Sequence, residues 1–177
     1  MSVNSKIGYG MITISVIFCV LGAIGYTIQD STDDIPTPSV RNTVFFADEA
    51  LPSNPFELFI TANAEVTWDR NDIFLVIADE GKKDQCSGLT LIEMMGQNSQ
   101  LCTKDDKEYK VIGDDNINGV SWDIMSEQDY VGIGSFNEMS DGFELNVDYT
   151  VKMTLSPTSY FVSFIIIVIG FTLTRYD

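Results

Sequence analysis

The sequence predicts a mainly β protein: an extracytoplasmic, antiparallel, jelly-roll-like β-sandwich flanked by an N-terminal and a C-terminal transmembrane helix. Two observations predict this fold class. Long apolar runs occupy the two ends of the chain, and the segment between them shows repeated alternation of apolar and polar residues, which is typical of half-buried strands. With 177 residues, the chain has room for one domain of ordinary size between the two helices.

The first apolar run covers residues 7–28 and contains no charged side chain. Its 22 residues are enough to cross a bilayer core, which needs about 20 helical residues. An alternative is a cleaved signal peptide, because Lys6 precedes the run and Ala23, Ile24 and Gly25 form a small-x-small pattern near its end. Cleavage would leave one membrane anchor instead of two.

The second apolar run is predicted as a transmembrane helix over residues 157–175. Ser156 is a plausible N-cap, and Pro157 suits the first helical position. At ~1.5 Å per residue the helix would span about 28 Å, enough to cross a bilayer core. Tyrosines, which favour the headgroup level, lie near the ends of both runs: Tyr9, Tyr26, Tyr160 and Tyr176.

The flanking charges predict the orientation. Lys6 is the last residue of the short tail 1–6, and Arg175 directly precedes the tail 176–177. The residues after the first helix, in contrast, are rich in Asp. Cations are retained on the cytoplasmic side of membranes, so both tails are expected there and the central domain outside. Neither run contains a charge within its apolar span, which argues against an ion or proton pathway.

The central segment is strongly acidic. Residues 29–157 hold 25 of the 26 acidic residues and 8 of the 10 basic ones, so their formal charge is −17. Such a surface repels nucleic acid, and a nucleic-acid role is excluded. It favours cations, basic partners or a salt-rich medium, although solubility alone also accounts for it.

The chain contains no histidine. Its absence excludes Ser-His-Asp and Cys-His catalysis, His-ligated metals and the usual general base at neutral pH. A carboxylate-dependent hydrolase is a remaining alternative, but acidic pairs such as Asp105 and Asp106 lie in polar, turn-like stretches and are expected to be solvated surface groups. No enzyme activity and no cofactor is therefore predicted.

Cys86 and Cys102 are predicted to form a disulfide, since both lie in the outer domain. The bond would close a loop of 17 residues, and the lost loop entropy is worth ~3 kcal/mol. A metal or redox pair would require closer C-x-x-C spacing and further soft ligands.

The acidic β-sandwich is predicted over residues 43–156, after a polar linker at 29–42. Residues 58–68 and 143–155 alternate between apolar and polar, as expected for long strands with one buried face. The last of these strands leads directly into the second helix. The remaining predicted segments are strand 43–47, the buried strand 73–78 in a hairpin with 58–68 through a turn at 69–72, a charged loop at 79–84, a helix or strand at 89–95, and strands 108–112, 120–125 and 130–136.

Asp114, Asn116 and Asn118 are candidate calcium ligands. They occupy positions 1, 3 and 5 of a calcium-loop pattern, and Gly119 follows at position 6. Position 12 is Met125, where a bidentate Glu is expected. A plain Asn/Asp/Gly turn between strands uses the same residues and is the favoured interpretation.

Two further groups of residues have alternative roles. Ser15, Cys19 and Ala23 form a stripe of small side chains on the first helix, which favours contact with another helix, either the second anchor or a partner. Aromatic residues could line a carbohydrate or peptide groove, but core packing is favoured for those on apolar strand faces. The aromatic residues concerned are Trp68, Trp122, Tyr130 and Tyr149.

These features favour a non-enzymatic accessory or scaffold protein in a larger membrane complex. Its expected partners are the lipid bilayer and either another membrane protein or further copies of itself. The alternative is a cell-surface binding module for calcium, a basic partner or a small extracellular ligand.

Overall fold

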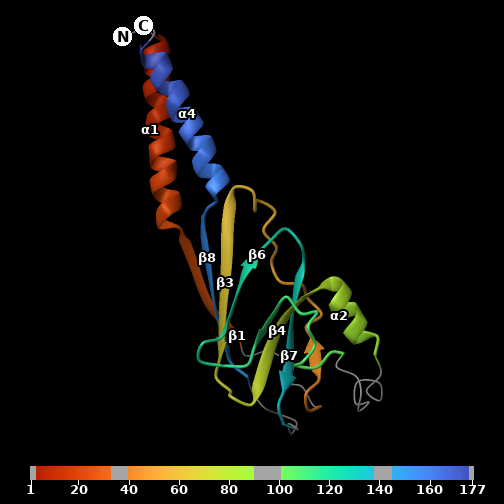
Figure 1. Cartoon of the computed structure of the whole chain (residues 1–177). Helices are drawn as coiled ribbons and strands as arrows, with labels where there is room; N and C mark the ends of the chain where they lie inside the picture. The colour runs from red at the N-terminus through yellow and green to blue at the C-terminus, as the bar shows by residue number, and fades with distance from the viewer. Residues whose placement is uncertain (1–2, 33–39, 90–100, 138–144, 176–177) are drawn as a thin grey trace.

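The computed structural model describes residues 3–32, 40–89, 101–137 and 145–175 (Figure 1). These residues form two antiparallel four-stranded sheets, and a long apolar helix lies at each end of the chain. The predicted mainly β class with flanking helices is confirmed. The predicted helix or strand at 89–95 falls outside the described residues except for its first position, as do residues 143–144 of the last predicted strand.

The terminal helices α1 (Val3–Ile24) and α4 (Pro157–Arg175) lie side by side and run in opposite directions (Figure 1). Both are long and apolar enough to cross a membrane. Helix α1 starts and ends four residues earlier than predicted. It ends because Gly25 adopts φ +74°, a left-handed conformation that stops the helix and that glycine tolerates best.

The predicted linker at 29–42 is wrong over its first residues. Residues Tyr26–Thr32 form strand β1, which pairs along its whole length with strand β8 (Val147–Leu155). Residues 26–31 of β1 are all exposed, because the strand lies at a sheet edge. An edge strand that is exposed to solvent on both faces needs no alternation of apolar and polar residues. Its residue pattern therefore looks like that of a polar linker.

The first sheet has the strand order β1-β8-β3-β6, where β3 is Ile60–Trp68 and β6 is Val120–Ile124. The second sheet has the order β2-β7-β4-β5. Its strands are β2 (Val44–Phe46), β7 (Asp129–Ser135), β4 (Ile73–Asp79) and β5 (Val111–Gly113). The predicted strands at 43–47, 120–125 and 130–136 are thereby confirmed, whereas the strand predicted at 108–112 begins later, at Val111.

The predicted hairpin between 58–68 and 73–78 is wrong, because β3 and β4 belong to different sheets. The turn at 69–72 carries the chain from one sheet to the other. Strand β3 instead pairs with β6 and β8, and β4 pairs with β5 and β7. A short polar turn is compatible with either connection, so the local sequence does not distinguish a hairpin from a crossing between sheets.

The main core combines side chains from both sheets. Val66, Trp68 and Val147 of the first sheet share one buried cluster with Leu75 and Ile133 of the second. Alternate positions of β3, from Ala62 to Trp68, are buried, which confirms the pattern predicted there. Burial of this apolar surface is the main favourable contribution to folding.

Strand β4 is buried on both faces, as its continuous apolar sequence predicted. Ile73, Leu75 and Ile77 belong to the main core, whereas Phe74 and Val76 pack in a second cluster. The second cluster lies on the opposite face of the sheet and also contains Val44, Ala78 and Tyr109.

Helix α2 (Glu80–Ser87) replaces the predicted charged loop at 79–84. Asp79 is its N-cap, and a carboxylate oxygen of Asp79 accepts a hydrogen bond from the Lys82 backbone N–H at 2.8 Å. The helix buries Lys82 and Cys86, four residues apart on one face. The helix was missed because its buried face contains no apolar stripe.

Candidate functional site

The junction between the domain and the helix pair is the candidate functional site. Gly25 is the single residue between α1 and β1, and Ser156 is the single residue between β8 and α4. The two strands that enter the helices are themselves paired, with Tyr26 opposite Met153 nearest the helices. Paired strands therefore continue directly into paired helices, and this geometry restricts rotation of the domain relative to the helices.

Hydrogen bonds fasten the start of α4 to residues 54–59, which we call the junction loop. The Ser156 N–H donates to the Phe59 carbonyl at 2.9 Å, and the Ser159 hydroxyl donates to the same oxygen at 2.7 Å. The Ser156 hydroxyl donates to the Leu58 carbonyl and accepts from the Ser159 N–H. Ser156 is therefore the N-cap that the sequence predicted.

Small residues allow α1 and α4 to approach closely. A Cβ atom added to Gly8 would lie 2.5 Å from the Gly170 carbonyl oxygen, and one added to Gly170 would lie 2.8 Å from the Gly8 carbonyl oxygen. Ser15 of the predicted small-residue stripe is buried, Cys19 is half-buried and Ala23 is exposed. Two helices can therefore share a close backbone contact, as small residues permit in membranes, but Ala23 is not part of the buried surface.

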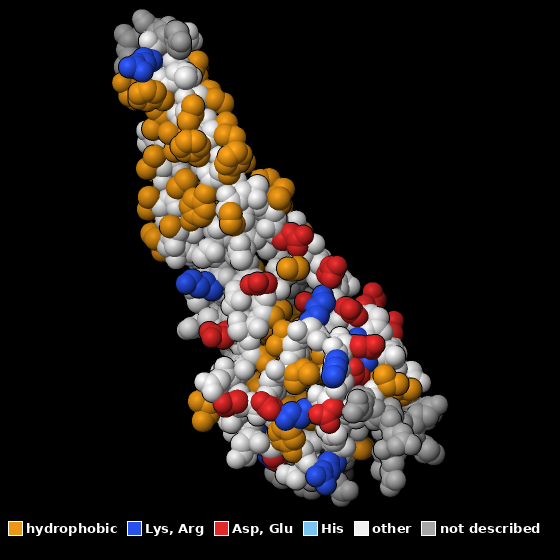
Figure 2. Space-filling view, viewed as in Figure 1, with side chains coloured by type: hydrophobic (Ala, Val, Ile, Leu, Met, Phe, Trp, Pro, Cys, Tyr) orange, Lys and Arg blue, Asp and Glu red, His pale blue; other side chains and the backbone are white. Residues whose placement is uncertain are grey.

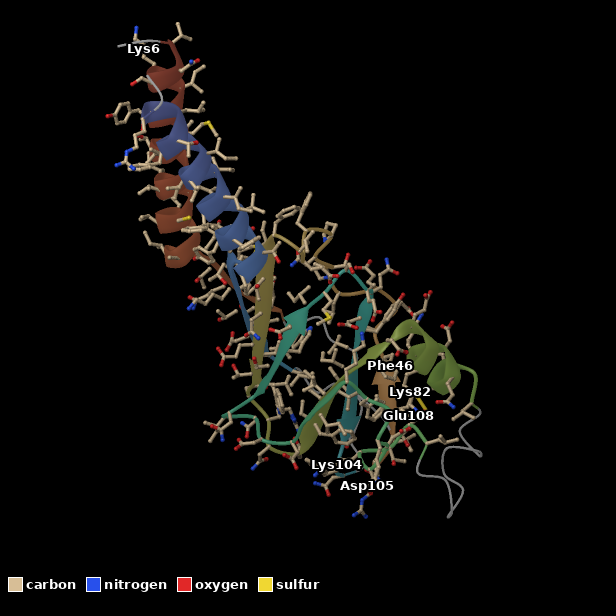
Figure 3. The ribbon with its side chains drawn as sticks, turned by 45° about the horizontal axis from the view of Figure 1, so that its top comes forward. Lys6, Phe46, Lys82, Lys104, Asp105 and Glu108 are labelled. Atoms are coloured by element: carbon tan, nitrogen blue, oxygen red, sulfur yellow. A yellow bond between two sulfur atoms is a disulfide. The ribbon has the colours of Figure 1, made fainter. Side chains whose placement is uncertain are left out.

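The outer surface of the helix pair is apolar, and charged side chains gather on the domain (Figure 2). Ile14, Leu21, Phe161 and Phe164 are each more than half exposed. Lys6 and Arg175 lie at the end of the pair away from the domain (Figure 3). Such an exposed apolar surface is suited to lipid and not to water.

A second cluster lies around Lys82 on α2, on the opposite side of the domain from β1 (Figure 3). The Lys82 ammonium donates to Gln85 Oε1 at 2.7 Å and contacts the carboxylates of Asp106 and Glu108 at 2.6 and 2.8 Å. Its three hydrogens thus have three acceptors. The Lys82 and Asp106 side chains are only 3% and 4% exposed, so the prediction that Asp105 and Asp106 are both solvated is wrong for Asp106.

The two buried groups in this cluster are held in their charged forms. Burial by itself lowers the pKa of Lys82, but hydrogen bonds to Asp106 and Glu108 outweigh it and raise the pKa above its ordinary value. Burial raises the pKa of Asp106, but hydrogen bonds from Lys82 and from the Cys102 and Glu108 amides outweigh it, and the pKa is lowered. An ion pair stabilised in this way serves structure and is not poised for proton transfer.

The predicted disulfide between Cys86 and Cys102 is present, with a Cα–Cα distance of 5.6 Å. Cys86 lies one turn after Lys82, and the Cys102 N–H donates to Asp106 Oδ2 at 2.8 Å. The disulfide and the ion pair therefore join the same two segments, α2 and residues 101–108. Cys102 has φ +58°, a strained value for a non-glycine residue that these bonds help to hold.

The candidate calcium ligands each have another partner. Asp114 pairs with Lys104 at 2.7 Å, the Asn116 amide donates to the Trp68 carbonyl, and the Asn118 amide donates to Asp115. Gly119 has φ +66°, as the turn requires. Within the part of the chain that the structure describes, no group of three His, Cys, Asp or Glu side chains could hold a metal ion. The calcium site therefore stays an untested alternative to the favoured interpretation of these residues as a plain turn.

The four aromatic residues considered for a binding groove lie in or against the core. Trp68 and Tyr130 are buried, and Trp122 and Tyr149 are half-buried and pack against the main cluster. The favoured role in core packing is confirmed for Trp68 and Tyr149. The junction loop, in contrast, was not identified as a site from the sequence, because residues 58–59 were assigned to the start of the predicted strand 58–68, whereas β3 begins at Ile60.

No protein-family model and no curated protein matches the chain. A solved structure described as "Bacillus endospore appendages form a novel family of disulfide-linked pili" aligns with 78% of this chain and 96% of its own chain, at 13% sequence identity and a TM-score of 0.27. A similarity of this size does not establish a shared fold.

Proposed function

We propose that this chain is a non-enzymatic accessory or scaffold protein of a larger membrane complex, anchored by two transmembrane helices. It would present an acidic, jelly-roll-like β-sandwich at the outer membrane surface. The observation that carries the proposal is the pair of single-residue connections, Gly25 and Ser156, between the domain and the helix pair. A domain held this closely is suited to contact with neighbours in the same membrane.

The strand pairing supports the jelly-roll interpretation. The pairs β1·β8, β2·β7, β3·β6 and β4·β5 are those of one long antiparallel ribbon. Further pairing of β8 with β3 and of β7 with β4 divides the ribbon into two four-stranded sheets. This arrangement is the one expected when such a ribbon wraps into a double-sheet jelly roll.

The charges support the proposed orientation. Lys6 and Arg175 mark one end of the helix pair and the acidic domain lies at the other. Cytoplasmic retention of the cations would place both termini inside and the domain outside. The disulfide agrees with this orientation, since disulfides persist in oxidising compartments.

The close packing of α1 on α4 leaves their outward faces available for a partner. Ala23 and Gly10 lie on α1 away from the buried contact with α4, and a Cβ on Gly10 would meet nothing within 4 Å. Contact with a partner helix would favour such small residues. The proposal thus locates partner contacts on the outward faces of the helices and on exposed faces of the sheets.

The test is an affinity purification of the tagged full chain from its native membrane in mild detergent. Stoichiometric membrane proteins that co-purify would support the proposal, and Gly10→Leu and Ala23→Leu variants are expected to reduce their recovery. Phe164→Leu, a substitution on the exposed face of α4, provides a matched control with an unchanged apolar surface. A monomer that saturably binds calcium or a basic peptide would instead support the binding-module alternative.

A further inference from the structure

We infer that the junction loop is a second membrane contact, which inserts Phe56, Leu58 and Phe59 into the interfacial layer of the bilayer. The inference rests on the proposed membrane-spanning role of α1 and α4. It adds a direct attachment of the domain itself to lipid, so that the domain would lean against the membrane and not project freely from it.

The three side chains are exposed although they are large and apolar. Their exposed fractions are 62% for Phe56, 59% for Leu58 and 46% for Phe59. Met125, whose carbonyl accepts a hydrogen bond from the Asn54 N–H at 2.7 Å, is 52% exposed beside them. A group of apolar side chains on one short loop is costly in water and indicates a surface that is covered in use.

The position of the loop indicates that the cover is lipid. Its carbonyls at Leu58 and Phe59 accept hydrogen bonds from Ser156, the N-cap of α4, and from Ser159 in the first turn of α4. In Figure 1 the loop lies beside the start of α4, at the end of the domain nearest the helices. If α4 crosses the membrane from Pro157, its first turn lies at the headgroup level, and the loop must lie at the same level.

The loop is held in one shape before any contact with lipid. The Asn54 side chain is buried; its amide donates to the Ile60 carbonyl at 2.6 Å and its carbonyl oxygen accepts from the Phe56 N–H at 3.2 Å. A preorganised loop loses little conformational entropy when it binds. Apolar area buried at the interface would then contribute almost fully to attachment.

Glu57 is the single acidic residue of the junction loop, and its carboxylate is held by the domain. Glu57 Oε2 accepts a hydrogen bond from the Ser126 N–H at 2.7 Å, in the turn that joins β6 to β7. The charge is therefore tied to the domain while the neighbouring apolar side chains remain exposed. This division of polar and apolar groups is the pattern of a segment that lies in a membrane interface.

The test measures depth in the membrane with fluorescent probes on the full chain in phosphatidylcholine vesicles. In a Cys19→Ser background, one cysteine is introduced and labelled with an environment-sensitive dye. The positions are Leu58→Cys in the loop, Phe164→Cys on the lipid-facing side of α4, and Ile117→Cys, which is 81% exposed. Ile117 follows Asn116, whose amide donates to the carbonyl of Trp68 at the end of β3 away from the helices. Lipids with a quencher near the headgroup or near the bilayer centre report depth, and iodide reports exposure to water.

The expected result is that the probe at Leu58 is blue-shifted and quenched most strongly by the shallow lipid quencher. The probe at Ile117 should respond only to iodide, and the probe at Phe164 should be quenched by the deep lipid quencher. Added Phe56→Ser and Phe59→Ser substitutions should return the Leu58 probe toward the response at Ile117. Non-reducing mass measurement of the Cys86–Cys102 disulfide checks that each variant is folded.

Two outcomes would overturn the inference. If the Leu58 probe responds to iodide as the Ile117 probe does, while Phe164 is quenched by lipid, the helices span the bilayer but the loop stays in water. If the Leu58 probe is shielded from iodide and from both lipid quenchers, protein covers the loop. Failure of lipid quenching at Phe164 would instead contradict the proposed anchoring itself.

Discussion

Lys82 and Asp106 form an ion pair, 2.6 Å between Nζ and Oδ2, in which both side chains are almost fully buried. The pair joins α2 to the segment that carries Cys102, beside the disulfide. A buried pair of this kind costs desolvation when it forms, but removal of one partner leaves the other charge buried without compensation. Much of the stability of this side of the domain should therefore depend on it.

Lys82→Met should destabilise the folded domain by about 3–5 kcal/mol, because it leaves Asp106 buried and unpaired. Chemical denaturation of the full chain in detergent, followed by tryptophan fluorescence, measures the change. Glu108→Gln is the matched control: Glu108 also contacts Lys82 but is 64% exposed, so its loss should cost at most about 1 kcal/mol. Equal losses of stability in the two variants would contradict the conclusion that the buried Lys82–Asp106 pair contributes most of the stability at this site.

The ion pair also predicts how stability depends on pH. The pKa of Asp106 is lowered by folding, so its contribution is present above the ordinary Asp pKa and is lost as pH falls through the lowered value. The pKa of Lys82 is raised, so its contribution is present below the ordinary Lys pKa and is lost as pH rises through the raised value. The stability difference between wild type and Lys82→Met should be largest near neutral to mildly alkaline pH. It should shrink above about pH 10, as Lys82 loses its proton, and shrink in acid, because the buried Asp106 of the variant has no cation to keep its pKa low and takes up a proton first. Melting curves across this range measure it; a difference independent of pH would argue against the pair.

Gly8→Val should force α1 and α4 apart, because any Cβ at this position meets the Gly170 carbonyl. Spin labels at Ile7 and Phe171, both exposed, would report a longer and broader distance distribution in vesicles. Gly10→Val is the control, since a Cβ there has open space. An unchanged distance in Gly8→Val would show that the helices are not packed through these glycines.

Tyr109→Phe is expected to leave stability unchanged or to raise it by about 1 kcal/mol. Among the described residues the buried Tyr109 hydroxyl has no hydrogen-bond partner, and burial together with the Asp106 charge raises its pKa well above the ordinary range. Phenylalanine keeps the ring packing and removes the unsatisfied group. A large loss of melting temperature in this variant would reveal an essential partner of the hydroxyl.

Calcium at millimolar concentration should leave the melting temperature unchanged. Asp114 is paired with Lys104, and the Asn116 and Asn118 amides are hydrogen-bonded elsewhere, so a calcium site would require all three to rearrange. A titration followed by thermal melting provides the test. A rise that saturates with calcium and disappears in Asp114→Asn would establish the site.

Local patterns in the sequence predicted the elements that have a distinct burial pattern. The apolar ends predicted two long helices, alternation predicted β3 and β8, and the continuous apolar run predicted that β4 is buried on both faces. Ser156 and Pro157 marked the start of α4, and the two outer cysteines predicted the disulfide. Each of these features depends on which side chains avoid water, or on a backbone cap within a few residues, and such information is present locally in the chain.

The tertiary structure decided the relations between distant segments. Strand β1 exists because β8 supplies its hydrogen-bond partners, and the turn at 69–72 crosses between sheets because β3 and β4 have different neighbours. Lys82 and Asp106 are 24 positions apart and have ordinary surface residue types, so only the fold could show that they are buried together. The junction loop likewise became a candidate membrane contact only when Ser156 and Ser159 fixed its level against α4. Pairing and depth depend on contacts across the chain, which a local pattern does not record.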